Sequence, residues 1–236
     1  DGFIDKDPTK ISWSSSLIPD LVNGKVGEID GTNSQLSIYR PYSKQWLYFD
    51  PMFNHRVSQM RRIFPVGAAT NIVINLSNIG SKFEFSALLC DAAPDFQTHF
   101  NGQCFPLYLY DEAAQQSDDG LFAGQSGDGP RRRDAITEAG LAHFQSAYPG
   151  EAISKEDLFY YVYGLLHSPD YRERYADNLS KELPRIPRVR RPEDFRAFSQ
   201  AGRDLAALHL GYETVDMYPL TVEAKGKLTD ADYRVE

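Results

Sequence analysis

The sequence predicts an α+β fold. A β-rich N-terminal half with a mixed or antiparallel sheet would be braced by a helical C-terminal half with a late strand. Short runs of β-branched and aromatic residues follow one another from residue 36 to residue 110, which is typical of strands. A stretch rich in Gly, Asp, Gln and Ser then interrupts this pattern and predicts a loop. Segments of helical periodicity, each with start and stop signals, occupy the rest.

We therefore expect four parts along the chain. They are a connecting segment (1–35), a β-rich part that holds the functional loops (36–110), a mobile loop or insertion (111–134) and a helical support part with a terminal strand (135–236). The connecting segment is polar and rich in turns, with one helix that would end near Asn23-Gly24.

Four runs in the β-rich part predict strands. LSIYRPYSKQWLYFD, from Leu36, favours extended segments broken at Pro41. TNIVINLS and FEFSALLC are typical of buried strands, and CFPLYLY closes the region. Tight turns are expected at Asn78-Ile79-Gly80-Ser81 and at Asn101-Gly102.

The helical part begins with a capping box. Ser154 would cap a helix together with Asp157, and the apolar face of that helix would consist of Leu158, Tyr161, Val162, Leu165 and Leu166. Ser168 would cap a second helix with Pro169 at its first position. Its apolar stripe would be Tyr171, Tyr175 and Leu179, and Pro184 and Pro187 would end it.

Pro192 opens a third predicted helix, which Gly211 would end. Its inward residues would be Phe195, Phe198, Leu205 and Leu208. After this helix, YPLTVEAKG is typical of a strand.

Composition limits the possible functions. The formal net charge of −8 means that a polyanion would have to bind a local basic patch, not the whole surface. Two cysteines, Cys90 and Cys104, do not make a disulfide framework, so we expect reduced thiols in a cytoplasmic protein. The sequence has no signal peptide and no apolar run near ~18 residues, so we expect no membrane span.

Common catalytic motifs are missing from the sequence. The adjacent His167-Ser168 pair lies at a predicted helix boundary, where we interpret the serine as a cap, since neighbouring side chains do not normally point at one another. The five histidines are far apart and no HExxH occurs, so we expect no metal site. There is also no phosphate-binding glycine motif and no Asn/Asp-Pro-Pro-aromatic tetrapeptide of adenine methyltransferases.

One pattern resembles a metal-dependent nuclease. Asp216 is followed by Glu223-Ala-Lys225 on a predicted strand. In such enzymes the carboxylates hold Mg²⁺ and the lysine stabilises developing charge. The spacing is short and Glu-x-Lys is a common tripeptide, so we favour an exposed alternating strand.

Basic residues interleaved with aromatic residues form four clusters. Such residues neutralise phosphates or stack on bases, although each cluster taken singly is equally well explained as a solvated face. Asparagine and serine side chains at nearby turns are of the kinds that hydrogen-bond to base edges, and also of the kinds that make turns. The clusters lie in YRPYSKQWLYFD, HRVSQMRR, RRRD and PRIPRVRR.

The order of these segments resembles a known family. YRPYSKQWLYFD, CFPLYLY, DLFYYVYGLLHSPDYRERYADNLSKELPRIP and AGRDLAALHLGYE follow one another in the chain. They are similar to the C-terminal specificity region of single-chain, ATP-dependent restriction–modification enzymes of the Type ISP kind. The resemblance extends from about Leu36 to Gly211. It implies a target recognition domain that is not catalytic by itself and needs no cofactor.

The resemblance also implies partners. These are double-stranded DNA and the methyltransferase domain of the same chain, and the region itself would be monomeric. The nuclease, motor and methyltransferase of the parent enzyme would use Mg²⁺, ATP and S-adenosylmethionine. The alternatives are a structural domain that packs on the methyltransferase, or a Mg²⁺ nuclease. The candidate DNA contacts are Arg40, Lys44, Arg56, Arg61 and Arg62, a reading loop of Ser77, Asn78, Ser81 and Lys82, and further arginines at Arg131, Arg132, Arg133, Arg188, Arg190 and Arg191.

Overall fold

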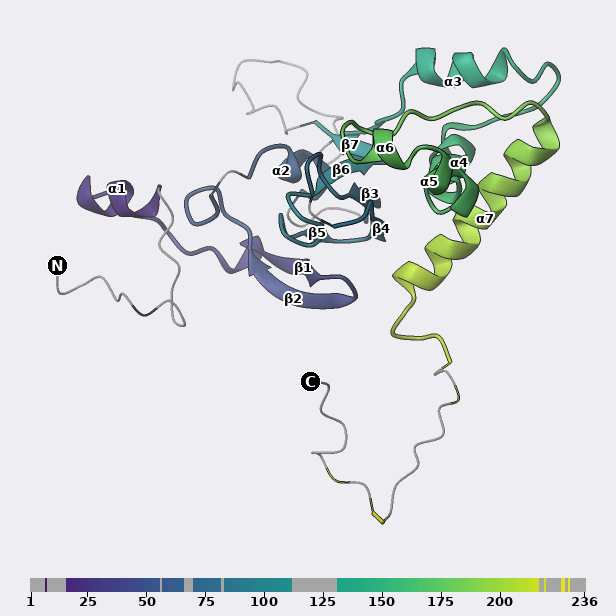
Figure 1. Cartoon of the computed structure of the whole chain (residues 1–236). Coiled ribbons are helices and arrows are strands. Elements are labelled where there is room, and N and C mark those ends of the chain that lie inside the picture. Colours follow the sequence, from purple (N-terminus) through teal and green to yellow (C-terminus); the bar gives the residue numbers. More distant parts are fainter. Residues whose placement is uncertain are drawn as a thin grey trace, which may run out of the picture.

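The α+β prediction is confirmed (Figure 1). Most strands lie in the N-terminal half, and the helices gather in the C-terminal half, which includes the long α7. The computed structural model describes residues 7, 16–55, 57–65, 70–81, 83–111, 131–216, 219, 226–227 and 229. The predicted strand after Gly211 lies largely outside these residues.

The first sheet is mixed and has the strand order β2-β1-β5. Strand β1 (Ser34–Arg40) pairs antiparallel with β2 (Ser43–Tyr48) and parallel with β5 (Ala93–Pro94). Pro41 and Tyr42 form the connection between β1 and β2, where the sequence predicted a break, and Tyr42 adopts a positive φ of 59°. Helix α1 (Leu17–Val22) ends at Asn23, as predicted, and the 3-10 turn η1 (Gly31–Asn33) precedes β1.

The second sheet is antiparallel, with the order β4-β3-β6. The two runs predicted as buried strands are β3 (Val73–Leu76) and β4 (Ala87–Cys90), and every residue of both is buried. CFPLYLY forms β6 (Gln103–Pro106) and β7 (Tyr108–Tyr110). Strand β7 pairs with β8 (Arg132–Asp134), so the last residues of the segment expected to be a loop extend a small sheet.

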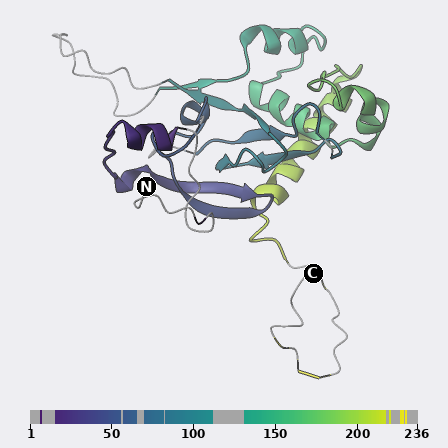
Figure 2. The same ribbon diagram turned by 60° about the vertical axis from the view of Figure 1, so that its left-hand side comes forward.

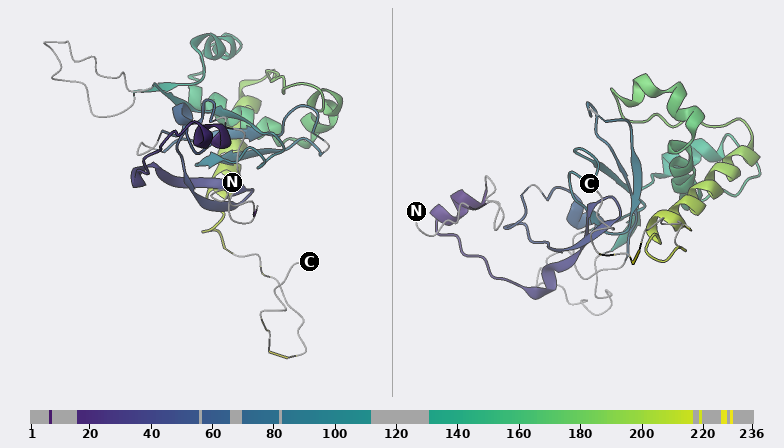
Figure 3. Two further views of the ribbon diagram at one scale, coloured as in Figure 1. Left: turned by 90° about the vertical axis from the view of Figure 1, so that its left-hand side faces the viewer. Right: turned by 60° about the horizontal axis from the view of Figure 1, so that its bottom comes forward.

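The second sheet separates two hydrophobic cores, because successive residues of a strand point to opposite faces. On one face, Val73 and Leu88 pack with Ile38 of β1 and with Ile63 of the short helix α2 (Met60–Ile63). On the other face, Ile74 and its neighbours pack against the helices. Figures 2 and 3 show the C-terminal helices on one side of the sheets and the β1–β2 hairpin on the other.

The predicted helix caps are confirmed. Ser154 and Asp157 form a complete capping box at the start of α4 (Lys155–Leu166). Ser168 accepts a hydrogen bond from the Tyr171 amide, with Pro169 at the first position of α5 (Pro169–Arg174). His167 closes α4, so the His167-Ser168 pair marks a helix boundary. The sequence analysis missed α3 (Glu138–Gln145), which Thr137 caps.

Two details of the helical prediction are wrong. The second predicted helix breaks at Tyr175, and its continuation α6 (Ala176–Leu179) ends well before Pro184. Helix α7 (Pro192–Leu210) begins at Pro192 as predicted, but Leu208 is 54% exposed. Thirteen residues at 100° each turn Leu208 to roughly the opposite side of the helix from the fully buried Phe195.

Helices α4 and α7 cross in close contact at two glycines. A Cβ atom on Gly202 would overlap the carbonyl oxygen of Tyr160, and one on Gly164 would overlap that of Phe198. This approach lets the rings of Tyr161 and Phe195 stack, with centroids 4.7 Å apart. The crossing therefore requires glycine at both positions.

The helix pair also binds the edge of the second sheet. The hydroxyl of Tyr163 in α4 accepts a hydrogen bond from the Leu89 amide of β4 at 3.0 Å, and it lies 2.5 Å from Nδ1 of His209 in α7. His167 packs its ring on Tyr163, with centroids 4.7 Å apart. Burial, with help from the charge of Arg172, lowers the pKa of His167 from its ordinary 6.5 to about 4.

Gly202→Ala should destabilise the chain by about 3 kcal/mol, because the new methyl group forces two backbones apart. Thermal unfolding checks this. Gly31→Ala is the matched control, since a Cβ atom there meets nothing within 4 Å. Equal melting temperatures for the two variants would contradict the close crossing.

The pKa of His167 predicts that stability falls in acid. Between about pH 6.5 and pH 4 the unfolded chain holds a proton on this residue that the folded chain lacks. The free energy of unfolding therefore rises with pH in this window and is lost as the pH falls. In His167→Gln, urea unfolding should show a flatter pH dependence. Parallel curves for wild type and variant would refute the assignment.

Candidate nucleic-acid interface

The predicted reading loop lies at one end of the second sheet. It connects β3 to β4 and carries Ser77, Asn78 and Ser81, all partly exposed. The predicted turn at 78–81 is present, because the Ser81 amide donates to the Asn78 carbonyl at 3.3 Å. Gly80 adopts a φ of 77°, a conformation that favours glycine.

A second loop, residues 95–102, packs against the reading loop. The Asn78 amide donates to the Phe100 carbonyl at 3.2 Å, and Gln103 Nε2 donates to Asn78 Oδ1 at 2.7 Å. Asn101, in the predicted Asn-Gly turn, has a positive φ of 51°. Asn78 therefore joins two loops that are distant along the chain.

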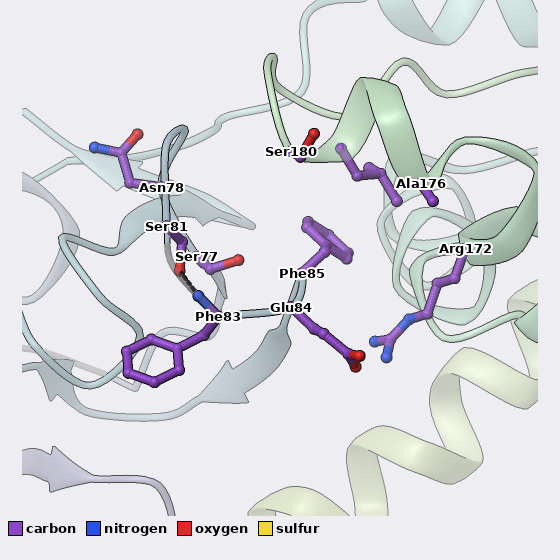
Figure 4. A pocket seen from close by; sticks show the side chains of 10 residues that line it. Ser77, Asn78, Ser81, Phe83, Glu84, Phe85, Arg172, Ala176 and Ser180 are labelled. Carbon is purple, nitrogen blue, oxygen red and sulfur yellow. Dashed lines mark hydrogen bonds between the residues drawn. The ribbon is translucent and has the colours of Figure 1, made fainter.

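The helices brace the reading loop from its other side (Figure 4). A pocket of about 380 Å³ lies between Ser77, Asn78 and Ser81 on one wall and Arg172 and Ser180 on the other. The Gly80 amide reaches the Ser180 carbonyl at 3.4 Å. Arg172 is itself held by Nε, which donates to the Leu166 carbonyl at 2.6 Å. The loop thus rests on a fixed helical surface.

Several exposed residues of the two loops were missed by the sequence analysis. They include Phe83, 74% exposed, and Phe96, 62% exposed, with the exposed Gln97 beside the latter. Aromatic residues within polar, turn-rich segments were the available signal. The pairing of the two loops could not be predicted from the sequence, because it depends on contacts across the sheet.

The basic candidates on the hairpin are paired with acidic side chains. Arg40 lies 3.5 Å from Asp95, and Lys44 lies 3.2 Å from Asp91. Arg40 also places its guanidinium 4.1 Å from the ring centroid of Tyr39. The attached Asp91 and Asp95 reduce the local positive charge of the hairpin.

The structure brings two other basic clusters together at Asp111. Arg62 of α2 and Arg133 of β8 both lie near the Asp111 carboxylate, at 3.9 and 3.2 Å. Their neighbours Arg61 and Arg131 are exposed, and Arg132 lies over the Tyr108 ring at 4.3 Å. We call Arg61, Arg62 and Arg131–Arg133 the arginine cluster.

The third group belongs to the helical part. Arg188 donates to the His143 carbonyl at 2.7 Å, Arg191 pairs with Asp194 at 2.6 Å, and Arg190 is exposed. These contacts attach the group to α3 and α7, separately from the reading loop. Arg56, Lys82, Glu223 and Lys225 lie outside the described residues, and Asp216 is exposed.

Within the described part of the chain, no group of three or more His, Cys, Asp or Glu side chains is arranged to hold a metal ion. Cys90 and Cys104 are free thiols, and burial raises the pKa of Cys104 to about 12. Across the same residues, no helix has the length and apolar character to cross a membrane.

Comparison with known proteins decides the family. The sequence profile described as "Type ISP C-terminal specificity domain" matches residues 2–236. The chain belongs to this family. The match confirms the resemblance in the sequence and extends it beyond the expected segment from Leu36 to Gly211 on both sides.

Solved structures similar to this specificity domain include complexes with DNA. A DrdV–DNA complex is 35% identical with a TM-score of 0.77, and the match covers 94% of this chain and 20% of that one. The Type ISP enzyme LlaBIII bound to DNA is 30% identical with a TM-score of 0.73, over 88% and 13%. A nuclease-deletion mutant of the Type ISP enzyme LlaGI with a DNA substrate mimic is 31% identical with a TM-score of 0.70, over 92% and 17%.

The specificity domain therefore spans a fifth or less of these relatives. A search of proteins with curated descriptions gave no match.

Asn78→Ala should loosen the paired loops of the specificity domain, because it removes the acceptor for Gln103 and for the Ile79 amide. Each lost bond costs about 1 kcal/mol. Hydrogen–deuterium exchange should quicken in residues 77–81 and 100–103. Exchange should stay slow in α4. The control is Gln200→Ala, which removes an exposed hydrogen bond on α7 and should leave the exchange rate of both loops unchanged. Unchanged loop exchange in Asn78→Ala would contradict the role of this side chain.

Proposed function

We propose that this chain recognises a specific sequence of double-stranded DNA for a Type ISP restriction–modification enzyme. The observation that carries the proposal is the pair of loops joined by Asn78, which presents amide and hydroxyl groups at one end of a braced sheet. Its support includes the family and the DNA in the similar structures. Cleavage and methylation would belong to other parts of the parent enzyme.

Base reading fits the chemistry of the two loops. Amide and hydroxyl side chains form hydrogen bonds with base edges, and the major groove distinguishes all four base pairs by these bonds. Gln97 is exposed, and Ser81 and Asn101 are partly so. Since the loop backbones are held by internal hydrogen bonds, contact with DNA would cost little ordering.

The arginine cluster would supply phosphate contacts. Exposed ion pairs such as those of Asp111 contribute little to stability, so DNA phosphates can replace this carboxylate as partners of Arg62 and Arg133. We assign the same role to Arg40, Lys44, Arg188, Arg190 and Arg191. The net charge of −8 would repel DNA elsewhere and favour docking through these patches.

The expected cofactors and the partner domain belong to the parent enzyme. ATP, Mg²⁺ and S-adenosylmethionine would serve its motor, nuclease and methyltransferase, and this chain would function as a monomeric unit beside the methyltransferase. Membership in a specificity-domain family favours sequence recognition over the nuclease of Asp216, Glu223 and Lys225.

A second role, packing on the methyltransferase, is favoured by one surface. An apolar groove of about 390 Å³ runs between β6 and the segment 183–186, with Phe105 exposed by 41%. Such grooves commonly receive other protein segments. This role is compatible with DNA recognition, because the groove lies on the opposite face of the sheet from the hairpin.

Selection from random duplexes tests the proposal. The chain should enrich one sequence motif, and absence of enrichment, also with the parent methyltransferase present, would refute it.

With the selected duplex, Arg61→Gln/Arg62→Gln should weaken binding to all sequences alike. The slope of log affinity against log salt should become shallower by about 2, since each phosphate contact contributes about 0.9.

The control carries the same charge change elsewhere. Lys25→Gln/Arg174→Gln alters two exposed basic residues outside the candidate set and should leave the salt slope at its wild-type value. If both double variants keep wild-type affinity and slope, the arginine cluster does not touch DNA and the packing role gains support.

A further inference from the structure

Three apolar side chains stand exposed at the loop end of the second sheet. Phe83 is 74% exposed, Phe96 62% and Ile79 47%. Ile79 and Phe83 belong to the reading loop, and Phe96 belongs to the loop paired with it. Single exposed apolar residues are ordinary, but a group of them among polar residues marks an interaction surface.

Local bonds fix the backbone at both rings. The Phe83 amide donates to Ser81 Oγ at 3.0 Å, and the Phe83 ring meets the edge of Phe100 with centroids 6.4 Å apart. The Phe96 carbonyl accepts from the Gly102 amide at 2.9 Å. The backbone that carries each ring is therefore already ordered, which lowers the entropy cost of binding a partner.

Phe83 and Phe85 both line the neighbouring pocket. Figure 4 shows Phe85 between the reading loop and Arg172, whereas the ring of Phe83 extends to the side of the loop away from Arg172. Phe83 thus leaves most of its apolar surface in water. A surface of this size stabilises a complex when a partner covers it.

The surrounding chemistry favours bases as that partner. Asn78, Gln97 and Asn101 supply amides next to the rings, and amides bond to base edges. Apolar side chains that enter between base steps unstack them and kink the duplex. Rings and amides on one rigid surface would therefore suit a distorted duplex.

We propose that Phe83 inserts between neighbouring bases of the bound duplex, while Phe96 packs on bases from the paired loop. This inference rests on the proposed function and deepens it, since it assigns an apolar wedge to the reading surface. The wedge would add specificity for base steps that unstack easily, without a hydrogen bond to either base.

The test uses the chain with its selected duplex, in which 2-aminopurine replaces one base at a time. Wild type should brighten the probe at one step, and Phe83→Ala should abolish that change. Phe83→Ala should also weaken binding roughly five- to hundredfold, the range for loss of one aromatic–base stack. The salt slope should stay constant, because no phosphate contact is removed.

Leu208→Ala is the control. It removes an exposed apolar side chain from α7 and should keep wild-type fluorescence and affinity. Phe83→Leu keeps apolar volume and guards against a folding defect. It should keep part of the fluorescence change with a smaller loss of affinity, at an unchanged melting temperature.

Three results would overturn the inference. The first is wild-type affinity in Phe83→Ala. The second is lost affinity in Phe83→Ala when the wild type brightens the probe at no step. The third is a Phe83→Ala variant that binds DNA normally but no longer attaches to the methyltransferase. A chain that binds no duplex would instead refute the proposed function. The failure of the wedge and the failure of DNA recognition are thus distinguishable.

Discussion

The close crossing of α4 and α7 is the contact on which the rest of the structure depends. Gly164 and Gly202 let the two backbones meet, and the ring of Phe195 is fully buried against Tyr161. The same approach holds Tyr163 against the Leu89 amide at the edge of the sheet. A larger residue at either glycine would move the helices and release this edge.

Short links connect the helix pair to the reading loop. Leu166 ends α4 and its carbonyl holds Arg172, which forms one wall of the pocket beside the reading loop. Ser180 bonds to Gly80 from the end of α6. Loops that bind a partner need such support, because contacts displaced by about an ångström lose much of their energy.

The basic side chains form ion pairs with acidic partners but stay at least partly exposed. Asp111 lies between Arg62 and Arg133, and Asp91 pairs with Lys44. All are at least partly exposed, where ion pairs contribute little. In the proposed complex, DNA phosphates would compete well with these carboxylates, because binding also releases counterions from DNA. The acidic partners thus keep the side chains ordered without blocking an electrostatic role.

The sequence by itself determined the features that arise from neighbouring residues. The capping box of Ser154 and Asp157, the start of α7 at Pro192 and the two buried strands were predictable, because local bonds and hydrophobic periodicity encode them. The order of the segments was sufficient to indicate the family.

Only the tertiary structure decided the features that join distant residues. The break at Tyr175, the exposed Leu208, the meeting of Arg62 with Arg133 and the pairing of loops through Asn78 belong to this group. The same physical reason explains why none of them could be predicted from the sequence. Each depends on which surfaces pack together once the chain is compact, and local propensity does not encode that choice.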